Sequence, residues 1–229
     1  DIENTWTAIE KGTTANVANL TINGGSIVDG YIGIDFTKAT GTDQDEGMLT
    51  GLTIDGMRFQ DLTAKGIYLE TVADGTITGV EMNNVGFFGS GPASGGPWAG
   101  TGIEINLKNG TYQNVTITDF QLDDTGTSAH PNSAAIAVKT RDDSAGYSPV
   151  SWVGDPLVIS NGTIDGTSTG IRAGEAGKNV QGPAVEVANV AITGETVADI
   201  DNVSQSTMTV TLTDGADTLT TAATTTGKV

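Results

Sequence analysis

The acid–base side chains that could act together are concentrated in one stretch of the sequence. Asp123 and Asp124 form a carboxylate pair, His130 is the single imidazole of the chain, and Lys139 and Arg141 follow shortly after. Hydrolysis of a glycoside needs two carboxyl groups, whereas elimination needs a base and a nearby positive charge that stabilises the developing anion. These residues are the candidate catalytic set. The competing interpretation is a solvated acidic loop, because neighbouring strand residues point to opposite faces and the two aspartates need not converge.

Three aromatic residues are candidates for contact with a sugar, because an aromatic ring offers a large apolar face. They are Phe88, Trp98 and Tyr147. Trp98 has a second interpretation, in which its ring folds back and covers the wall of the protein.

Acidic residues in two loops could supply the oxygen ligands that Ca²⁺ prefers. The first loop carries Asp43, Asp45 and Glu46, and the second carries Asp214 and Asp217. Ca²⁺ is therefore the candidate ion, and a solvated loop is the alternative in both places.

The composition limits the classes of partner. The 229 residues carry a formal net charge of −18, which disfavours nucleic acid because phosphate binding requires Lys and Arg. Anionic glycans are disfavoured for the same reason, unless Ca²⁺ or a local basic patch intervenes. The chain has no Cys, which excludes disulfides and zinc–thiolate sites. No stretch approaches the roughly 18 apolar residues of a transmembrane helix, so membrane insertion is not expected.

A recurring cassette predicts the fold. An apolar–polar–apolar triplet is followed by a turn residue and a second short apolar strand, which often begins with Gly-Ile. The triplets are Leu20-Thr21-Ile22, Leu52-Thr53-Ile54, Val80-Glu81-Met82, Val115-Thr116-Ile117, Leu157-Val158-Ile159 and Val185-Glu186-Val187. One unit cannot bury its apolar residues alone, whereas stacked units can, and abundant Gly, Asn and Asp suit tight corners. The sequence therefore predicts an all-β parallel solenoid of about six turns.

The cassettes also predict how the chain is divided. Residues 1–18 are expected to form an N-terminal cap or partial turn, in which Trp6 and Ile9 close the apolar core. The solenoid spans 19–206, and 207–229 is expected to be a terminal strand and a Thr-rich linker to a following module. Because the chain opens at Asp1 and not at Met, it is interpreted as a piece of a larger protein.

Long insertions interrupt the third and fourth cassettes. One runs from Gly89 to Thr101 and the other from Asp123 to Ser133. Both follow the first strand of their cassette, so they should lie side by side and form one lateral platform. A third excursion, over 139–155, leaves from the other corner of the fourth turn.

One row of residues bears on a different function, the binding of ice. Thr21, Thr53 and Thr116 occupy the same place in three cassettes, as the outward threonines of ice-binding solenoids do. Glu81, Val158 and Glu186 occupy that place in the other cassettes. The sequence therefore argues against an ice-binding row.

With these cassettes and Gly-Ile strands, the chain resembles the right-handed parallel β-helix superfamily of pectate and pectin lyases, polygalacturonases, alginate epimerases and phage tailspikes. The resemblance covers most of the chain and concerns architecture. It implies a single-stranded right-handed parallel β-helix with lateral loop insertions, in a large secreted bacterial surface protein or calcium-binding exoprotein. The Asn-Thr-Asp and Gly-His-Gly sequences of polygalacturonases and the Asp-Pro-His-Asp sequence of epimerases do not occur here.

The sequence thus favours a structural, adhesive or glycan-contacting module of an extracellular or cell-surface bacterial protein. Its expected partners are an extracellular polysaccharide or other copies of itself. The alternative is a polysaccharide lyase, epimerase or hydrolase that acts through the candidate catalytic set in the fourth turn. Convergence of that set in one cleft would favour the enzyme.

Overall fold

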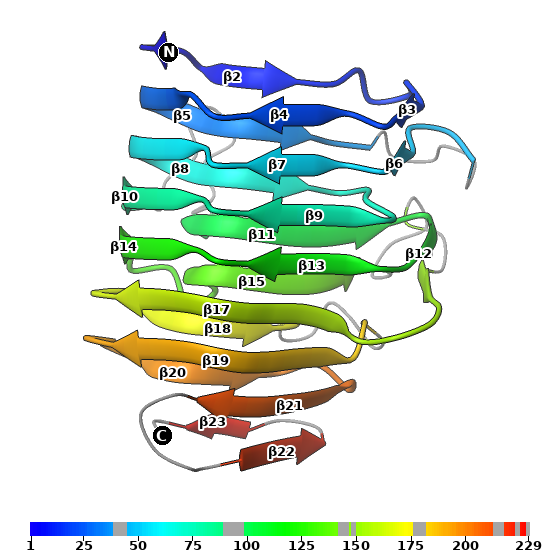
Figure 1. Cartoon of the computed structure of the whole chain (residues 1–229). Coiled ribbons are helices and arrows are strands. Elements are labelled where there is room, and N and C mark those ends of the chain that lie inside the picture. The colour runs from blue at the N-terminus through cyan, green and yellow to red at the C-terminus, as the bar shows by residue number, and fades with distance from the viewer. Residues whose placement is uncertain are drawn as a thin grey trace.

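The computed structural model describes residues 1–38, 45–88, 99–141, 147, 150–175, 182–212, 218–222 and 225–227. In these ranges all regular secondary structure is β-strand, and most strands pair in parallel with the strand of the preceding and the following layer (Figure 1). The strands stack in three ladders.

The first ladder contains the shortest strands. It stacks β4 (Thr21–Asn23), β7 (Thr53–Asp55), β9 (Gly75–Thr78), β13 (Val115–Thr118), the first halves of β17 (Leu157–Asp165) and β19 (Val185–Thr193), and β21 (Thr207–Leu212).

The second ladder follows the first along the chain. It stacks β1 (Ile2–Glu3), the first halves of β5 (Ser26–Phe36) and β8 (Arg58–Leu69), β10 (Glu81–Val85), β14 (Gln121–Thr125), and the second halves of β17 and β19.

The third ladder completes each layer. It stacks β2 (Thr7–Glu10), the second halves of β5 and β8, β11 (Thr101–Lys108), β15 (Ala134–Arg141), β18 (Thr169–Ala173) and β20 (Ala198–Asn202). Two short parallel pairs lie between the third and the first ladder, β3 (Val17–Ala18) with β6 (Leu49–Thr50) and β12 (Gly110–Tyr112) with β16 (Val150–Trp152).

The chain turns from one ladder to the next at residues in the left-handed region of backbone space. At the first-to-second corner these are Gly24, Gly56, Gly79, Asp119, Asn161 and Asn189, with φ between 54° and 64°. Glycine enters this region without steric cost, and Asn and Asp tolerate it better than other residues. The predicted role of Gly, Asn and Asp at tight corners is therefore confirmed.

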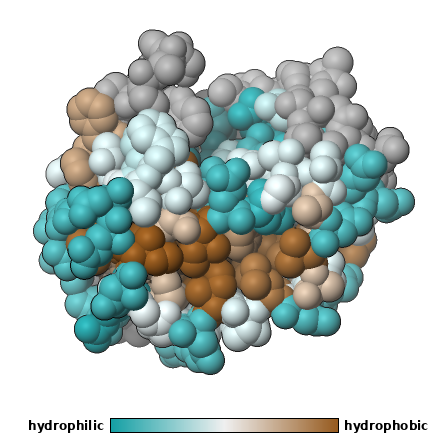
Figure 2. Space-filling view, turned by 90° about the horizontal axis from the view of Figure 1, so that it is seen from above, coloured by the Kyte–Doolittle hydropathy of each residue, from teal (hydrophilic) through white to brown (hydrophobic). Residues whose placement is uncertain are grey.

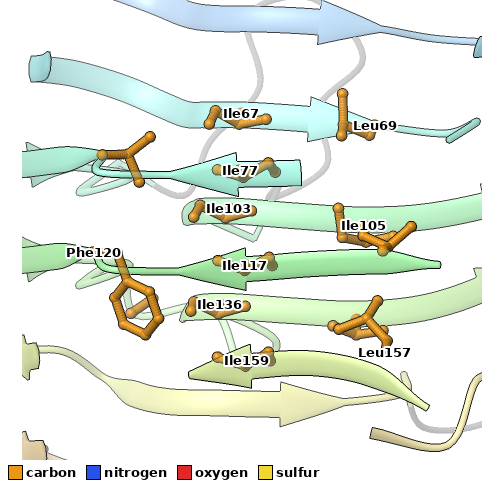
Figure 3. Packing of buried hydrophobic residues seen from close by; sticks show 14 of the residues in the cluster. Ile67, Leu69, Ile77, Ile103, Ile105, Ile117, Phe120, Ile136, Leu157 and Ile159 are labelled. Atoms are coloured by element: carbon orange, nitrogen blue, oxygen red, sulfur yellow. The ribbon is translucent and has the colours of Figure 1, made fainter. Parts of the chain in front are cut away.

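The inward side chains of the ladders form one apolar core. In Figure 3, Ile77, Ile117 and Ile159 of the first ladder stack in one row, and Ile67, Ile103 and Ile136 of the third ladder stack in another. Seven isoleucines of the cassettes are fully buried: Ile34, Ile54, Ile67, Ile103, Ile105, Ile117 and Ile136. Ile22 is only half-buried, because it lies near the N-terminal end of the stack.

The Gly-Ile signature has a steric cause. A Cβ atom on Gly66 would lie 2.8 Å from the carbonyl oxygen of Gly102 in the next layer. A Cβ on Gly170 would lie 2.5 Å from the carbonyl oxygen of Asp199. Because the layers approach so closely where the third ladder begins, these positions require a residue without a side chain.

The predicted register of the third cassette is wrong. Val80-Glu81-Met82 does not belong to the first ladder, since Glu81 pairs with Arg58 and Gln121 in the second ladder. The place assigned to it is filled by β9, where Thr76 pairs with Thr53 and Thr116. The two strands have the same alternation of apolar and polar residues, so the pattern alone did not separate them.

The two ends of the stack differ. At the N-terminal end a strip of apolar side chains is exposed (Figure 2), and the half-buried residues of this region are Ile2, Ala8, Ile9, Val17, Leu20 and Ile22. Trp6 does not cover them as predicted: it is 60% exposed and stacks on Tyr31, with ring centroids 4.2 Å apart. At the C-terminal end, where a linker was expected, β22 (Thr218–Ala222) and β23 (Thr225–Gly227) pair antiparallel with β21 and β20.

Candidate functional site

Positive charge is concentrated on the outward side of the third ladder. The chain has 10 Lys and Arg residues. Of those that the structure describes, all except Arg58 lie on third-ladder strands or directly after their C-terminal ends; these are Lys11, Lys38, Lys65, Lys108, Lys139, Arg141 and Arg172. The fold has therefore gathered all but one of the described cations on one face, which we call the basic face.

A buried ion-pair network forms the centre of the basic face. Glu104 contacts Lys65, and its Oε1 atom lies 2.9 Å from Lys139 Nζ, which in turn lies 2.7 Å from Glu175 Oε2. The register explains the contacts, because β8, β11 and β15 are neighbours in the third ladder, and Lys65 pairs with Thr101 and Lys139 with Asn106, on either side of Glu104. Burial opposes the charge of Glu104, but Lys139 and Lys65 hold its pKa well below the ordinary value. Burial lowers the pKa of Lys65.

A second polar group adjoins this network. Tyr68 Oη donates to Glu70 Oε1 at 2.6 Å, Asn106 Nδ2 donates to Tyr68 Oη at 2.7 Å, and Lys108 pairs with Glu70. Burial raises the pKa of Tyr68, and the charge of Glu70 raises it further. Lys65 Nζ lies 4.9 Å from the centre of the Tyr68 ring, which links the two groups.

Two acceptor atoms on the basic face are left without donors. Asp35 Oδ1 and Asn106 Oδ1 are buried and receive no hydrogen bond within the part of the chain that the structure describes. Buried acceptors are normally satisfied, so such atoms indicate a place for water or a ligand. Burial, followed by the charges of Glu70 and Glu10, raises the pKa of the Asp35 carboxyl to about 6.

His130 lies at the edge of the same face, in the connection between β14 and β15. Its Nδ1 atom accepts a hydrogen bond from the backbone N–H of Asn132 at 3.1 Å, so the neutral imidazole carries its proton on Nε2. Burial lowers the pKa of His130, and Glu175 and Lys139 act on it with opposite sign. Arg172 holds the loop in place, because its Nη1 donates to the carbonyl of Pro131 at 2.5 Å and pairs with Asp201.

The structure brings only part of the candidate catalytic set together. His130 and Lys139 belong to the basic face, and Arg141 lies at the end of β15 with its guanidinium 4.9 Å from the ring of Tyr147. Asp123 and Asp124 instead lie within β14 on the second ladder, where Gln121 Nε2 donates to Asp123 Oδ2 at 2.6 Å. The strand continues to Thr125, so the fourth-turn insertion begins after the two aspartates and not at them.

Exposed aromatic rings line the second-to-third corner beside the basic face. Phe88 is 52% exposed and Phe87 is 40% exposed, both between β10 and β11, and the Trp6–Tyr31 pair lies at the same corner nearer the N-terminus. Of the predicted sugar-binding residues, Phe88 is therefore accessible and Tyr147 is half-buried between Lys108 and Arg141. Trp98 lies outside the described residues.

The sequence did not single out the residues at the centre of the basic face: Asp35, Lys65, Tyr68, Glu70, Glu104, Asn106, Lys108 and Arg172. The signal that could have found them is the alternation of the third-ladder strands. The residue directly after each Gly-Ile pair occupies an outward position and is charged or phenolic: Asp35, Tyr68, Glu104 and Arg172.

The predicted calcium ligands are not brought together in the described residues. Asp45 and Glu46 are exposed in a turn, whereas Asp43, Asp214 and Asp217 lie outside the described residues. In the described ranges, no group of three or more His, Asp or Glu side chains is arranged so that it could hold a metal ion. The same ranges contain no helix that is long and apolar enough to cross a membrane.

A groove of about 560 Å³ lies elsewhere, at the first-to-second corner. Its lining includes Asp119, Phe120, Asn161 and Gly162, and no Lys or Arg. The groove is open and lacks a group of interacting charges, so we place the candidate site on the basic face.

Searches of protein-family models, curated proteins and solved structures find no match to this chain.

Proposed function

We propose that the stacked ladders form a single-stranded right-handed parallel β-helix, and that the chain is a glycan-contacting module of an extracellular bacterial protein. The parallel pairing, the left-handed corner residues and the single apolar core support the architecture. The resemblance to the pectate-lyase-like superfamily supports the extracellular setting.

The basic face is the proposed contact surface, and the gathering of cations on it is the observation that carries the proposal. The chain as a whole would repel an anionic glycan, because its formal net charge is −18. The basic face is the part of the described surface where cations balance the carboxylates, through the pairs of Lys65, Lys108, Lys139 and Arg172, so repulsion of such a ligand is weakest there. Burying ion pairs gives little net stability compared with apolar packing, so their concentration on one ladder favours a role in binding.

The other features of the basic face fit a sugar ligand. The unpartnered acceptors of Asp35 and Asn106 could take hydrogen bonds from sugar hydroxyls. The exposed rings of Phe88 and Trp6 offer apolar surfaces at the edge of the face. We therefore propose an acidic polysaccharide, such as a polyuronate, as the ligand.

The test is to titrate the chain with a polyuronate and with a neutral β-glucan and to measure binding by calorimetry at low and at physiological salt. Binding of the polyuronate should weaken with salt, and it should weaken in Phe88→Ala and in Trp6→Ala. Val153→Ala removes an exposed apolar residue away from the second-to-third corner and should bind like the parent. A chain that binds neither glycan, or whose aromatic variants bind equally well, would overturn the proposal.

A second proposal is that the same face catalyses lysis, epimerisation or hydrolysis of the bound glycan. The observation that favours it is the Asp35 carboxyl, whose raised pKa of about 6 suits proton transfer near neutral pH. Incubation with a polyuronate, followed by assays for unsaturated products, for new reducing ends and for uronate epimers, tests this. Turnover by the parent that is lost in Asp35→Asn would support catalysis, and no product in any assay would exclude it for that substrate.

We also propose that copies of the chain can associate through the exposed apolar strip at the N-terminal end. Edge strands with unpaired backbone groups favour such contacts. Light scattering over a range of concentrations tests this, and a mass that stays at that of one chain would exclude it.

A further inference from the structure

The outward side of the first ladder carries two regular columns of small polar side chains. In four consecutive layers the first column holds Thr21, Thr53, Thr76 and Thr116. The second column, two residues further along each strand, holds Asn23, Asp55, Thr78 and Thr118. The sequence suggested that Glu81 interrupts the first column, but Glu81 lies on the second ladder and Thr76 fills that place.

The columns form a regular lattice. Successive layers of a sheet are about 4.8 Å apart, and alternate residues of one strand are about 6.7 Å apart. The isoleucine between the two columns in each strand points into the core. Its packing keeps each of these strands at the same distance from the core. Because Thr is branched at Cβ and prefers few rotamers, its hydroxyl and methyl groups repeat with the backbone.

The hydroxyls of the first column are available to a ligand. Within the described residues, the side chains of Thr53, Thr76 and Thr116 make no hydrogen bond to protein. The second column is held from the side, since Thr118 Oγ1 donates to Asp119 Oδ2 at 3.3 Å and accepts from Ser160 Oγ at 3.2 Å.

Strand propensity alone does not account for the columns. Thr is favoured in exposed strands generally, so propensity would place it equally on the second ladder. There the outward positions of the corresponding layers instead hold Ser26, Val28, Arg58, Gln60, Glu81, Asn83, Gln121 and Asp123. In these four layers, the outward threonines are therefore confined to one of two neighbouring ladders.

The chemistry of the face restricts the ligand. Among the eight residues of the two columns, Asp55 is the single charged one, whereas the chain as a whole carries a formal net charge of −18. The columns contain no aromatic ring for a sugar and no cation for an anionic ligand. A nearly neutral lattice of hydroxyl and methyl groups is complementary to an uncharged solid whose molecules repeat at similar distances. The water molecules of hexagonal ice form such a solid.

We propose that the first ladder, over β4, β7, β9 and β13, binds ice. These strands form the near side of the stack in Figure 1. The register of their pairing places the column residues one above another in successive layers. Hydroxyls of the first column would bond to water in the crystal surface, while the methyl groups order the water between them. Val158 and Glu186 continue the first column in the next layers and limit the binding face on that side.

The test is inhibition of ice recrystallisation by the purified chain, together with thermal hysteresis. We expect the parent to slow crystal growth and Thr76→Lys/Thr116→Lys to lose the effect. The matched control is Gln60→Lys/Gln121→Lys, which adds the same charge to outward positions of the second ladder and should behave like the parent. Thr76→Val keeps the branched shape needed for folding and should reduce the effect, which covers the case in which the lysine variant unfolds.

A parent that leaves ice growth unchanged, or a folded Thr76→Lys/Thr116→Lys variant that is as active as the parent, would overturn the inference. The proposed glycan site is on the third ladder, so these variants should bind polyuronate normally. Failure of one proposal is therefore distinguishable from failure of the other.

Discussion

On the basic face, the surroundings of Asp35 disfavour the charged form of its carboxyl group. Asp35 is held among Glu70, Glu10, Lys65 and Lys108, and burial together with the two glutamates raises its pKa to about 6. An unfolded Asp titrates near 3.9. The folded state therefore holds a proton on Asp35 more tightly than the unfolded state does, and this favours folding only at low pH.

The first prediction follows from that difference. The contribution of Asp35 to stability is complete below about pH 4 and is lost as the pH rises through about 6. Asp35→Asn should therefore be more stable than the parent at pH 7, by about 1–2 kcal/mol after allowance for solvent screening, and the difference should vanish near pH 4. Urea unfolding at several pH values measures this. Asp29→Asn, an exposed corner residue, is the control, and a gain that does not depend on pH would contradict the prediction.

The second prediction concerns Glu104, whose two lysine partners are buried with it. Glu104→Gln should destabilise the fold by about 3–5 kcal/mol, because it leaves buried lysine charge without its carboxylate. Glu81→Gln is the matched control: its salt bridge with Arg58 is exposed, with side-chain exposures of 53% and 69%, and should contribute less than about 1 kcal/mol. Denaturant unfolding of both variants provides the comparison. Equal losses would show that the buried network adds nothing beyond a surface pair.

At the scale of the strand, the sequence predicted some elements well and others poorly. The third-ladder strands could be predicted because Gly-Ile recurs at their start. The close approach of neighbouring layers requires the glycine, so the signal recurs in the sequence. β9 was missed because Asp74-Gly75 reads as a turn and Val80-Glu81-Met82 repeats the alternation expected of the strand. Periodicity identifies a strand, but only the pairing of layers assigns it to a ladder.

The third prediction compares two isoleucines of the first ladder. Ile117 is fully buried between layers, whereas Ile22 is half-buried near the N-terminal end. Ile117→Ala should cost about 2–5 kcal/mol through lost burial and a cavity, and Ile22→Ala should cost clearly less because its side chain keeps contact with water. Thermal or denaturant unfolding measures both. A larger loss at Ile22 would mean that the N-terminal end is covered in solution.

At the scale of the whole molecule, the fold separates side chains by ladder. Apart from Arg58, the described cations lie on or directly after strands of the third ladder. Over β4, β7, β9 and β13, the outward threonines lie on the first ladder, and the outward residues of β8, β10 and β14 on the second ladder are amides and charged residues. The sequence contained the residues of the basic face but did not show that Lys65, Glu104 and Lys139 would be neighbours. They are distant along the chain and meet only through the register of β8, β11 and β15. His130 and Lys139 were found because they also lie in one stretch of sequence, whereas Asp123 and Asp124 shared that stretch but not the face.

The last prediction concerns the net charge of −18 and the expected calcium ligands. Self-repulsion among carboxylates destabilises a compact acidic chain, so NaCl should raise the melting temperature by screening alone. If the loops with Asp45 and Glu46 bind Ca²⁺, millimolar CaCl₂ should raise it further than NaCl of equal ionic strength, because a bound ion stabilises the native state. Asp45→Asn/Glu46→Gln should abolish the additional rise and keep the response to NaCl. If CaCl₂ and NaCl give the same curve at equal ionic strength, the ions act only by screening, and structural calcium is excluded.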